Sequence, residues 1–144
     1  MASVDRSERV ATVARVRRSA LLAVGDALAF MIFAALGRAS HSEAAGIAAI
    51  LQVAETAAPF AIGWFVVAPF AGTYRADIAS RPRQMLERSA LAWLLAWPIG
   101  LLLRALIRQT SIPLSFALVT LITNMLILLG WRGLFAWLNV RRNA

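Results

Sequence analysis

The sequence predicts an all-α membrane protein that folds as a bundle of four transmembrane helices. Of the 144 residues, 60% are apolar, and the mean hydropathy is +0.71, whereas soluble proteins are about 45 to 50% apolar. Residues 56–74 form one stretch of 19 residues without a charge, and roughly 20 apolar helical residues cross a hydrocarbon layer about 30 Å thick. Three further apolar runs, separated by polar segments, indicate three more spans.

The first 18 residues are polar and carry five arginines, so residues 1–18 are expected to form a basic cytoplasmic tail. Two structures are open for this tail: an amphipathic helix on anionic headgroups, or a partly disordered, solvated segment. The first span is expected at residues 19–37, where many small residues allow close helix packing. Arg17 and Arg18 resemble a twin-arginine signal, but Asp26 and the length of the apolar run favour a retained span.

The second span belongs to an apolar stretch that is too long for one crossing. Residues 44–74 contain one charge, Glu55, and would be about 46 Å long as a straight helix. Pro59 lacks an N–H group and clashes with the preceding turn of a helix. We therefore expect a span at residues 57–74 that follows an interfacial or kinked extension. A single long, tilted and kinked helix is the alternative.

The third span is expected at residues 89–108 and the fourth at residues 114–136, with a short tail at residues 139–144. Arginine accounts for all 15 basic residues. Eleven lie in the two tails and the loop before the third span, whereas Arg38, Arg104 and Arg108 lie at the opposite ends of the spans. By the positive-inside rule both termini are cytoplasmic, as in a multi-pass protein of a bacterial inner membrane.

Two pairs of opposite charges are expected inside the spans. Asp26 and Arg132 lie at similar depths from the cytoplasmic ends of spans one and four, and Glu55 and Arg104 match near the outer face. We predict that Asp26 pairs with Arg132 and Glu55 with Arg104, because a buried charge needs a partner. These pairs either clamp the helices in register or line a proton or substrate pathway. The clamp is favoured, because a partner at matching depth removes the problem of burial. Exchanging Asp26 and Arg132 should then preserve folding.

Span four also carries a mildly polar stripe, which Thr120, Thr123, Asn124 and Ile127 form at helical spacing. Interhelical hydrogen bonds are the expected role of this stripe, and a substrate-lining role is the alternative. The five tryptophans are interpreted as interface anchors and packing groups.

Several function classes are excluded by composition and motifs. The net charge of +8 does not indicate nucleic-acid binding, because the arginines flank spans and do not line one face. The chain has no cysteine. The single histidine, His41, does not make a metal site with Ser42 and Glu43; a polar cap is its expected role and a haem ligand the alternative. Neither a phosphate loop nor a hydrolase motif is present, so no enzyme activity, cofactor or metal is expected.

Several of these features occur together in a recognisable order: Asp26 in span one, Gly37-Arg38 before Ser40-His41, Pro59-Phe60 before Gly63-Trp64, and Gly130-Trp131-Arg132. The set resembles the small prokaryotic membrane proteins grouped as domain of unknown function 3054, over about residues 21–138. The resemblance implies four spans and no known activity, and it nominates Arg38, His41, Pro59, Gly63 and Trp64 for testing.

From the sequence, the expected function is that of a non-enzymatic membrane protein acting through helix–helix interactions. It would work in the lipid bilayer as an accessory or assembly subunit of a larger membrane complex, or as a homo-oligomer. The alternative is a small oligomeric carrier or small-molecule binder with an intramembrane charged pathway, for which four spans require at least a dimer.

Overall fold

The computed structural model describes residues 2–39 and 46–143, and all the regular structure in these ranges is helical. Four long helices follow one another: α1 (Ala2–Ala39), α2 (Ile47–Phe70), α3 (Pro82–Arg108) and α4 (Leu114–Asn143), with a short 3₁₀ helix, η1 (Ala76–Ile78), before α3. Each of the four α-helices is long and apolar enough to cross a membrane. The predicted four-helix fold is therefore confirmed at this level.

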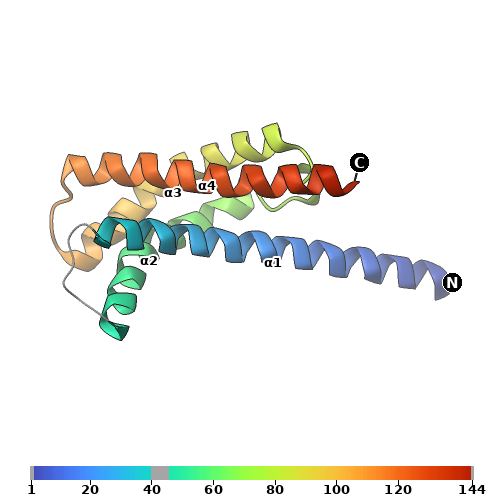
Figure 1. Cartoon of the computed structure of the whole chain (residues 1–144), viewed down its shortest axis with the longest axis horizontal. Coiled ribbons are helices and arrows are strands. Elements are labelled where there is room, and N and C mark those ends of the chain that lie inside the picture. The colour runs from blue at the N-terminus through green and yellow to red at the C-terminus, as the bar shows by residue number, and fades with distance from the viewer. Residues whose placement is uncertain (1, 40–45, 144) are drawn as a thin grey trace.

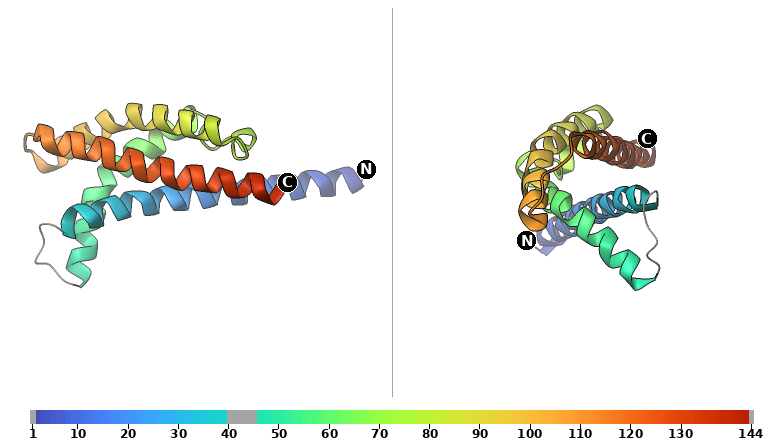
Figure 2. Two further views of the ribbon diagram at one scale, coloured as in Figure 1. Left: turned by 45° about the horizontal axis from the view of Figure 1, so that its top comes forward. Right: turned by 90° about the vertical axis from the view of Figure 1, so that its left-hand side faces the viewer.

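The helices form a ring, in which α1 packs on α2, α2 on α3, α3 on α4, and α4 on α1. Both chain termini lie at one end of the bundle, together with the turn between α2 and α3 (Figure 1). We call this the terminal end, and the opposite end, where α1 and α3 finish and α4 begins, the distal end (Figure 2). Large apolar side chains cover the outside of the bundle, as a hydrocarbon environment allows.

Each of the four helices extends beyond its predicted span: α1, α2 and α3 begin before residues 19, 57 and 89, and α4 continues past residue 136. The segment predicted as a separate tail is the start of α1, which is one helix from Ala2. Helix α2 begins at Ile47 and continues through Pro59 and Pro69 to Phe70. Residues 47–70 are thus one helix, as in the single-helix alternative. Its first turns point away from the other helices (Figure 1).

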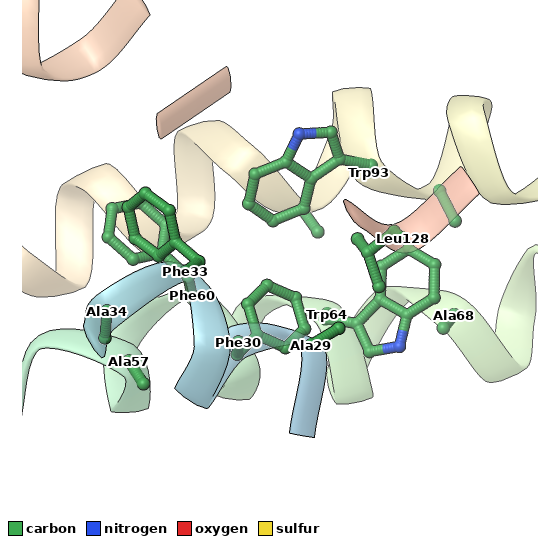
Figure 3. Close-up of a cluster of buried hydrophobic side chains, with 12 residues drawn as sticks. Ala29, Phe30, Phe33, Ala34, Ala57, Phe60, Trp64, Ala68, Trp93 and Leu128 are labelled. Atoms are coloured by element: carbon green, nitrogen blue, oxygen red, sulfur yellow. The ribbon is translucent and has the colours of Figure 1, made fainter. Parts of the chain in front are cut away.

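The core is a cluster of buried side chains from all four helices, and its buried aromatic rings come from α1, α2 and α3 (Figure 3). The ring of Phe30 lies 5.6 Å from that of Trp93 between centroids, and Phe33 meets Phe60 edge to face at 6.1 Å. Such tilted and edge-to-face pairs stabilise beyond their buried area by about 0.5 to 1.5 kcal/mol each. The aromatic rings thus hold the three helices in register.

Helices α2 and α3 approach each other closely at Gly63. A β-carbon placed on Gly63 would lie 2.7 Å from the carbonyl oxygen of Ala96 and 3.2 Å from the amide nitrogen of Gly100. Both neighbours are backbone atoms, which cannot swing aside as a side chain can. Small residues on both helices therefore set the separation of α2 and α3.

The turn after α2 places polar groups beside the core. Gly72 adopts a φ of +68°, which residues with a β-carbon rarely adopt. The amide of Thr73 then donates to the carbonyl of Ala68 at 3.1 Å, and its hydroxyl donates to the same oxygen at 3.0 Å. This closure aims the Thr73 carbonyl and the Tyr74 ring toward the interior of the bundle.

Candidate functional site

The structure brings Asp26 of α1 and Arg132 of α4 together in the half of the bundle nearer the termini. Arg132 donates from Nε to Oδ1 of Asp26 at 2.9 Å and from Nη2 to Oδ2 at 2.5 Å. Both side chains are 0% exposed. This two-pronged geometry is the strongest form of an arginine–carboxylate pair. It joins α1 to α4 through two residues that are 106 positions apart in sequence.

The remaining prong of Arg132 contacts two other parts of the fold. Its Nη1 donates to the carbonyl oxygen of Thr73 at 3.0 Å, and it lies 3.4 Å from the hydroxyl of Ser89 and 3.6 Å from the sulfur of Met85. Ser89 and Met85 belong to α3 and Thr73 to the turn after α2. One guanidinium group therefore connects α1, α4, α3 and this turn.

Asp26 accepts two further hydrogen bonds on its Oδ2 atom. The Tyr74 hydroxyl donates to it at 2.6 Å, and the indole N–H of Trp64 lies 3.1 Å from it and 3.1 Å from the Tyr74 oxygen. The Arg132 guanidinium also lies 4.9 Å from the ring centroids of both Trp64 and Tyr74, within cation–π range. The carboxylate is thus surrounded by donors, and the cation by acceptors and aromatic faces.

Tyr74, in the loop beyond α2, acts here as a donor. Burial, and then the charge of the adjacent Asp26 carboxylate, raise the pKa of the Tyr74 hydroxyl above its ordinary value. The hydroxyl therefore keeps its proton across the physiological range and donates it to Oδ2 of Asp26. The arrangement is that of a closed ionic centre, in which each group already has its partner.

Removing the Tyr74 hydroxyl tests this donor role. We expect Tyr74→Phe to lower the free energy of unfolding by about 1.5 to 3 kcal/mol, the range for a hydrogen bond to a charged group. Reversible unfolding in mixed micelles measures this change. A loss below about 0.5 kcal/mol, the size of a neutral surface substitution, would show that the hydroxyl does not support Asp26.

Glu55 and Arg104 require a correction, because in the structure Glu55 pairs with Arg108. The Arg108 Nη2 lies 3.4 Å from Glu55 Oε2, with both side chains about half exposed. The guanidinium of Arg104 instead lies over the Phe116 ring, 4.3 Å from its centroid. Matching by depth failed because Arg108, the last residue of α3, is only one helical turn beyond Arg104.

The polar stripe on α4 faces α3. Thr120 and Asn124 are buried, and the indole N–H of Trp97 lies 3.1 Å from the Thr120 hydroxyl. Trp93 donates to the carbonyl of Leu121 at 2.9 Å. Of the stripe residues, Thr120 takes part in an interhelical hydrogen bond as expected, whereas Asn124 donates to the Thr120 carbonyl of its own helix at 3.1 Å.

Of the positions that the family resemblance nominated, Pro59, Gly63 and Trp64 are buried on α2. Arg38 lies near the end of α1, and His41 lies outside the described residues. Within the described part of the chain, no group of three or more histidine, cysteine, aspartate or glutamate side chains could hold a metal.

Sequence reasoning missed Tyr74, Thr73 and Ser89 as members of the centre. It nominated Trp64 for testing but gave this side chain an anchoring or packing role. One signal was available for Tyr74. It is the single tyrosine of the chain, and it ends the uncharged stretch of residues 56–74 that contains Pro59. The Thr73 carbonyl carries no sequence signal, because any residue has one.

Comparison with known families gives one match. A family model described as "Protein of unknown function (DUF3054)" matches residues 23–135, which include Asp26, Trp64, Tyr74 and Arg132. Neither a curated protein nor a solved structure matches this chain.

Proposed function

The chain belongs to the DUF3054 family, whose function is unknown, and we propose from its own structure that it is a non-enzymatic membrane protein acting through helix–helix contacts. It serves as an accessory or assembly subunit of a larger membrane complex, or as a homo-oligomer. It sits in a bacterial inner membrane with both termini in the cytoplasm, in accord with the arginine distribution. The family match confirms the resemblance found in the sequence.

The observation that carries this proposal is the first part of α1, residues 6–17, which we call the arm. Helix α1 has 38 residues and is about 57 Å long, whereas the hydrocarbon layer is about 30 Å thick. Every residue of the arm is exposed. The first half of the arm continues the line of α1 past the end of α4 (Figures 1 and 2). Ala14 and Arg17, in its second half, line a groove with Leu138 and Asn139 of α4.

The arm has the properties of a helix that needs a partner. Val10, Val13 and Val16 are 66%, 66% and 63% exposed, and they follow one side of the helix at a spacing of three residues. A helix of about 12 residues without tertiary packing is marginal in water, and β-branched valine does not favour it. An apolar stripe of this kind is the surface by which one helix binds another.

The ionic centre supports a contact role over a transport role. Asp26 and Arg132 are 0% exposed and hold each other with two hydrogen bonds. A proton or ion pathway needs charged groups that exchange partners with a passing substrate, whereas these groups are committed to the fold. A carrier or binder remains the second candidate, and the cavity described below is the observation that favours it.

Cross-linking from the arm tests the proposal. Because the chain contains no cysteine, Val13→Cys introduces a unique thiol that can carry a photoactivatable benzophenone maleimide. We expect illumination of membranes containing this full-length variant to join the chain to a second copy or to one other protein, in high yield. The control is Ala11→Cys, which is also exposed but lies on the opposite side of the helix at 3.6 residues per turn. Equal yields, or lipid adducts alone, from both positions would contradict the proposal.

A further inference from the structure

A cavity of about 480 Å³ lies at the distal end of the bundle, away from the ionic centre. Phe33 and Arg38 of α1, Thr56 of α2, Arg104 of α3, and Ser115 and Phe116 of α4 line it. Figure 2 shows this end of the bundle, where α1 and α3 finish and α4 begins. All four helices contribute, so the cavity is a product of the fold and not of one loop.

The lining combines positive charge with apolar walls. Two arginines line the cavity, and no acidic side chain is among the described residues around it. The hydroxyl of Thr56 donates to its own helix, to the carbonyl of Gln52 at 3.0 Å, and Thr120 donates to the carbonyl of Ala117 at 2.8 Å. Both hydroxyl protons are thus used within their own helices, and the positive charge available to a ligand is that of Arg104. The cavity therefore favours a negative charge.

Arg104 has a donor that the fold leaves unused. Its guanidinium is held over the Phe116 ring at 4.3 Å, and its Nη1 atom is buried without a hydrogen-bond partner. Buried donors in folded proteins nearly always have an acceptor, and the described residues supply none to this atom. An oxyanion in the cavity would supply that acceptor.

We infer that this cavity binds an amphiphilic anion, with its carboxylate or phosphate group at Arg104 and its apolar part against Phe33 and Phe116. Arginine is suited to both oxyanions, because its planar fork presents parallel donors. The ligand is either the headgroup of an anionic lipid or a soluble organic anion. This site is independent of the arm and of its partner, and it goes beyond the proposed contact function.

Two variants remove the site in different ways, and each has a matched control. Arg104→Gln removes the charge, and its control is Arg108→Gln, four residues away and outside the cavity. Gly37→Val fills the cavity, since Gly37 lines it and a β-carbon there meets no atom within 4 Å. Its control is Gly130→Val, where a β-carbon also meets nothing within 4 Å. A folding defect would affect variant and control alike, so the comparison isolates binding.

The experiment is native mass spectrometry of the full chain with dodecyl phosphate, and with dodecanol as the uncharged match. The wild type should retain one dodecyl phosphate and no dodecanol. Arg104→Gln and Gly37→Val should weaken retention about tenfold or more, as expected for loss of a charge-assisted hydrogen bond, and both controls should retain it. Equal retention of dodecanol, or binding unchanged in both site variants, would overturn the inference.

A second arm distinguishes the two sources of the anion. The protein is released from nanodiscs of phosphatidylcholine that contain one-fifth phosphatidylglycerol, with and without dodecyl phosphate. Retained phosphatidylglycerol that dodecyl phosphate displaces would identify a lipid headgroup site. Retention of dodecyl phosphate without phosphatidylglycerol would identify a site for a soluble anion. Absence of both from the wild type would overturn the inference, whatever the outcome of cross-linking from the arm.

Discussion

Arg132→Met is expected to lower the free energy of unfolding by about 3 to 5 kcal/mol, because it leaves the Asp26 carboxylate buried without its cation. Asp26 is 0% exposed and accepts two hydrogen bonds from Arg132, so water cannot replace the lost partner. Asp26→Leu should have a loss of similar size, because it strands the guanidinium. Unfolding in mixed micelles, followed by tryptophan fluorescence, measures both losses.

The double variant Asp26→Leu/Arg132→Met separates a clamp from two independent contributions. The two residues contact each other, so the double variant should be more stable than the sum of the single losses predicts, by about 2 to 3 kcal/mol. It should not recover fully, since the Tyr74 hydroxyl, the Trp64 N–H and the Thr73 carbonyl lose their partners. Strict additivity of the single losses would contradict the clamp.

The surroundings of the pair also revise one expectation from sequence. Exchanging Asp26 and Arg132 was expected to preserve folding, as it would for an isolated clamp. In the structure, Tyr74 and Trp64 present donors to position 26, and Thr73 presents a carbonyl to position 132. An arginine at position 26 would therefore face two hydrogen-bond donors. An aspartate at position 132 would face a carbonyl oxygen, which is an acceptor like itself. The exchanged protein should therefore be as unstable as the single variants.

The second large effect is expected at the crossing of α2 and α3. Gly63→Ala should destabilise the fold by about 1 to 3 kcal/mol, the range for overpacking, because its β-carbon would lie 2.7 Å from the Ala96 carbonyl oxygen. Gly130→Ala is the matched control, since a β-carbon there meets no atom within 4 Å, and it should be neutral or stabilising. If unfolding midpoints were equal for the two variants, close backbone packing would not hold α2 to α3.

The sequence was sufficient for features that depend only on position along each span. Uninterrupted apolar runs require helices in a membrane, so four spans could be counted. Asp26 and Arg132 could be paired because each is the only charge at its depth in its span. Matching by depth failed for Glu55, because two candidate partners, Arg104 and Arg108, lie within one helical turn of each other. Depth along the bundle cannot distinguish two cations on neighbouring turns of one helix.

The rest of the centre depends on tertiary structure. Tyr74 and the Thr73 carbonyl reach Asp26 and Arg132 because Gly72 turns the chain back after α2, and spacing in sequence does not reveal that direction. The distal cavity combines residues from all four helices. The sequence could not indicate that Arg104 has an unpaired nitrogen, because Glu55 was its expected partner. In the structure, Glu55 pairs with Arg108 instead.

The central proposal is that this protein works through helix–helix contacts with another protein or with further copies of itself. Native mass spectrometry of the full-length chain, gently extracted from its own membrane, tests it most directly. The proposal predicts a complex whose mass equals the chain plus one further protein in fixed ratio, or a whole multiple of the chain. A single chain with lipids or small molecules but no other protein, recovered under conditions that preserve known membrane complexes, would contradict it.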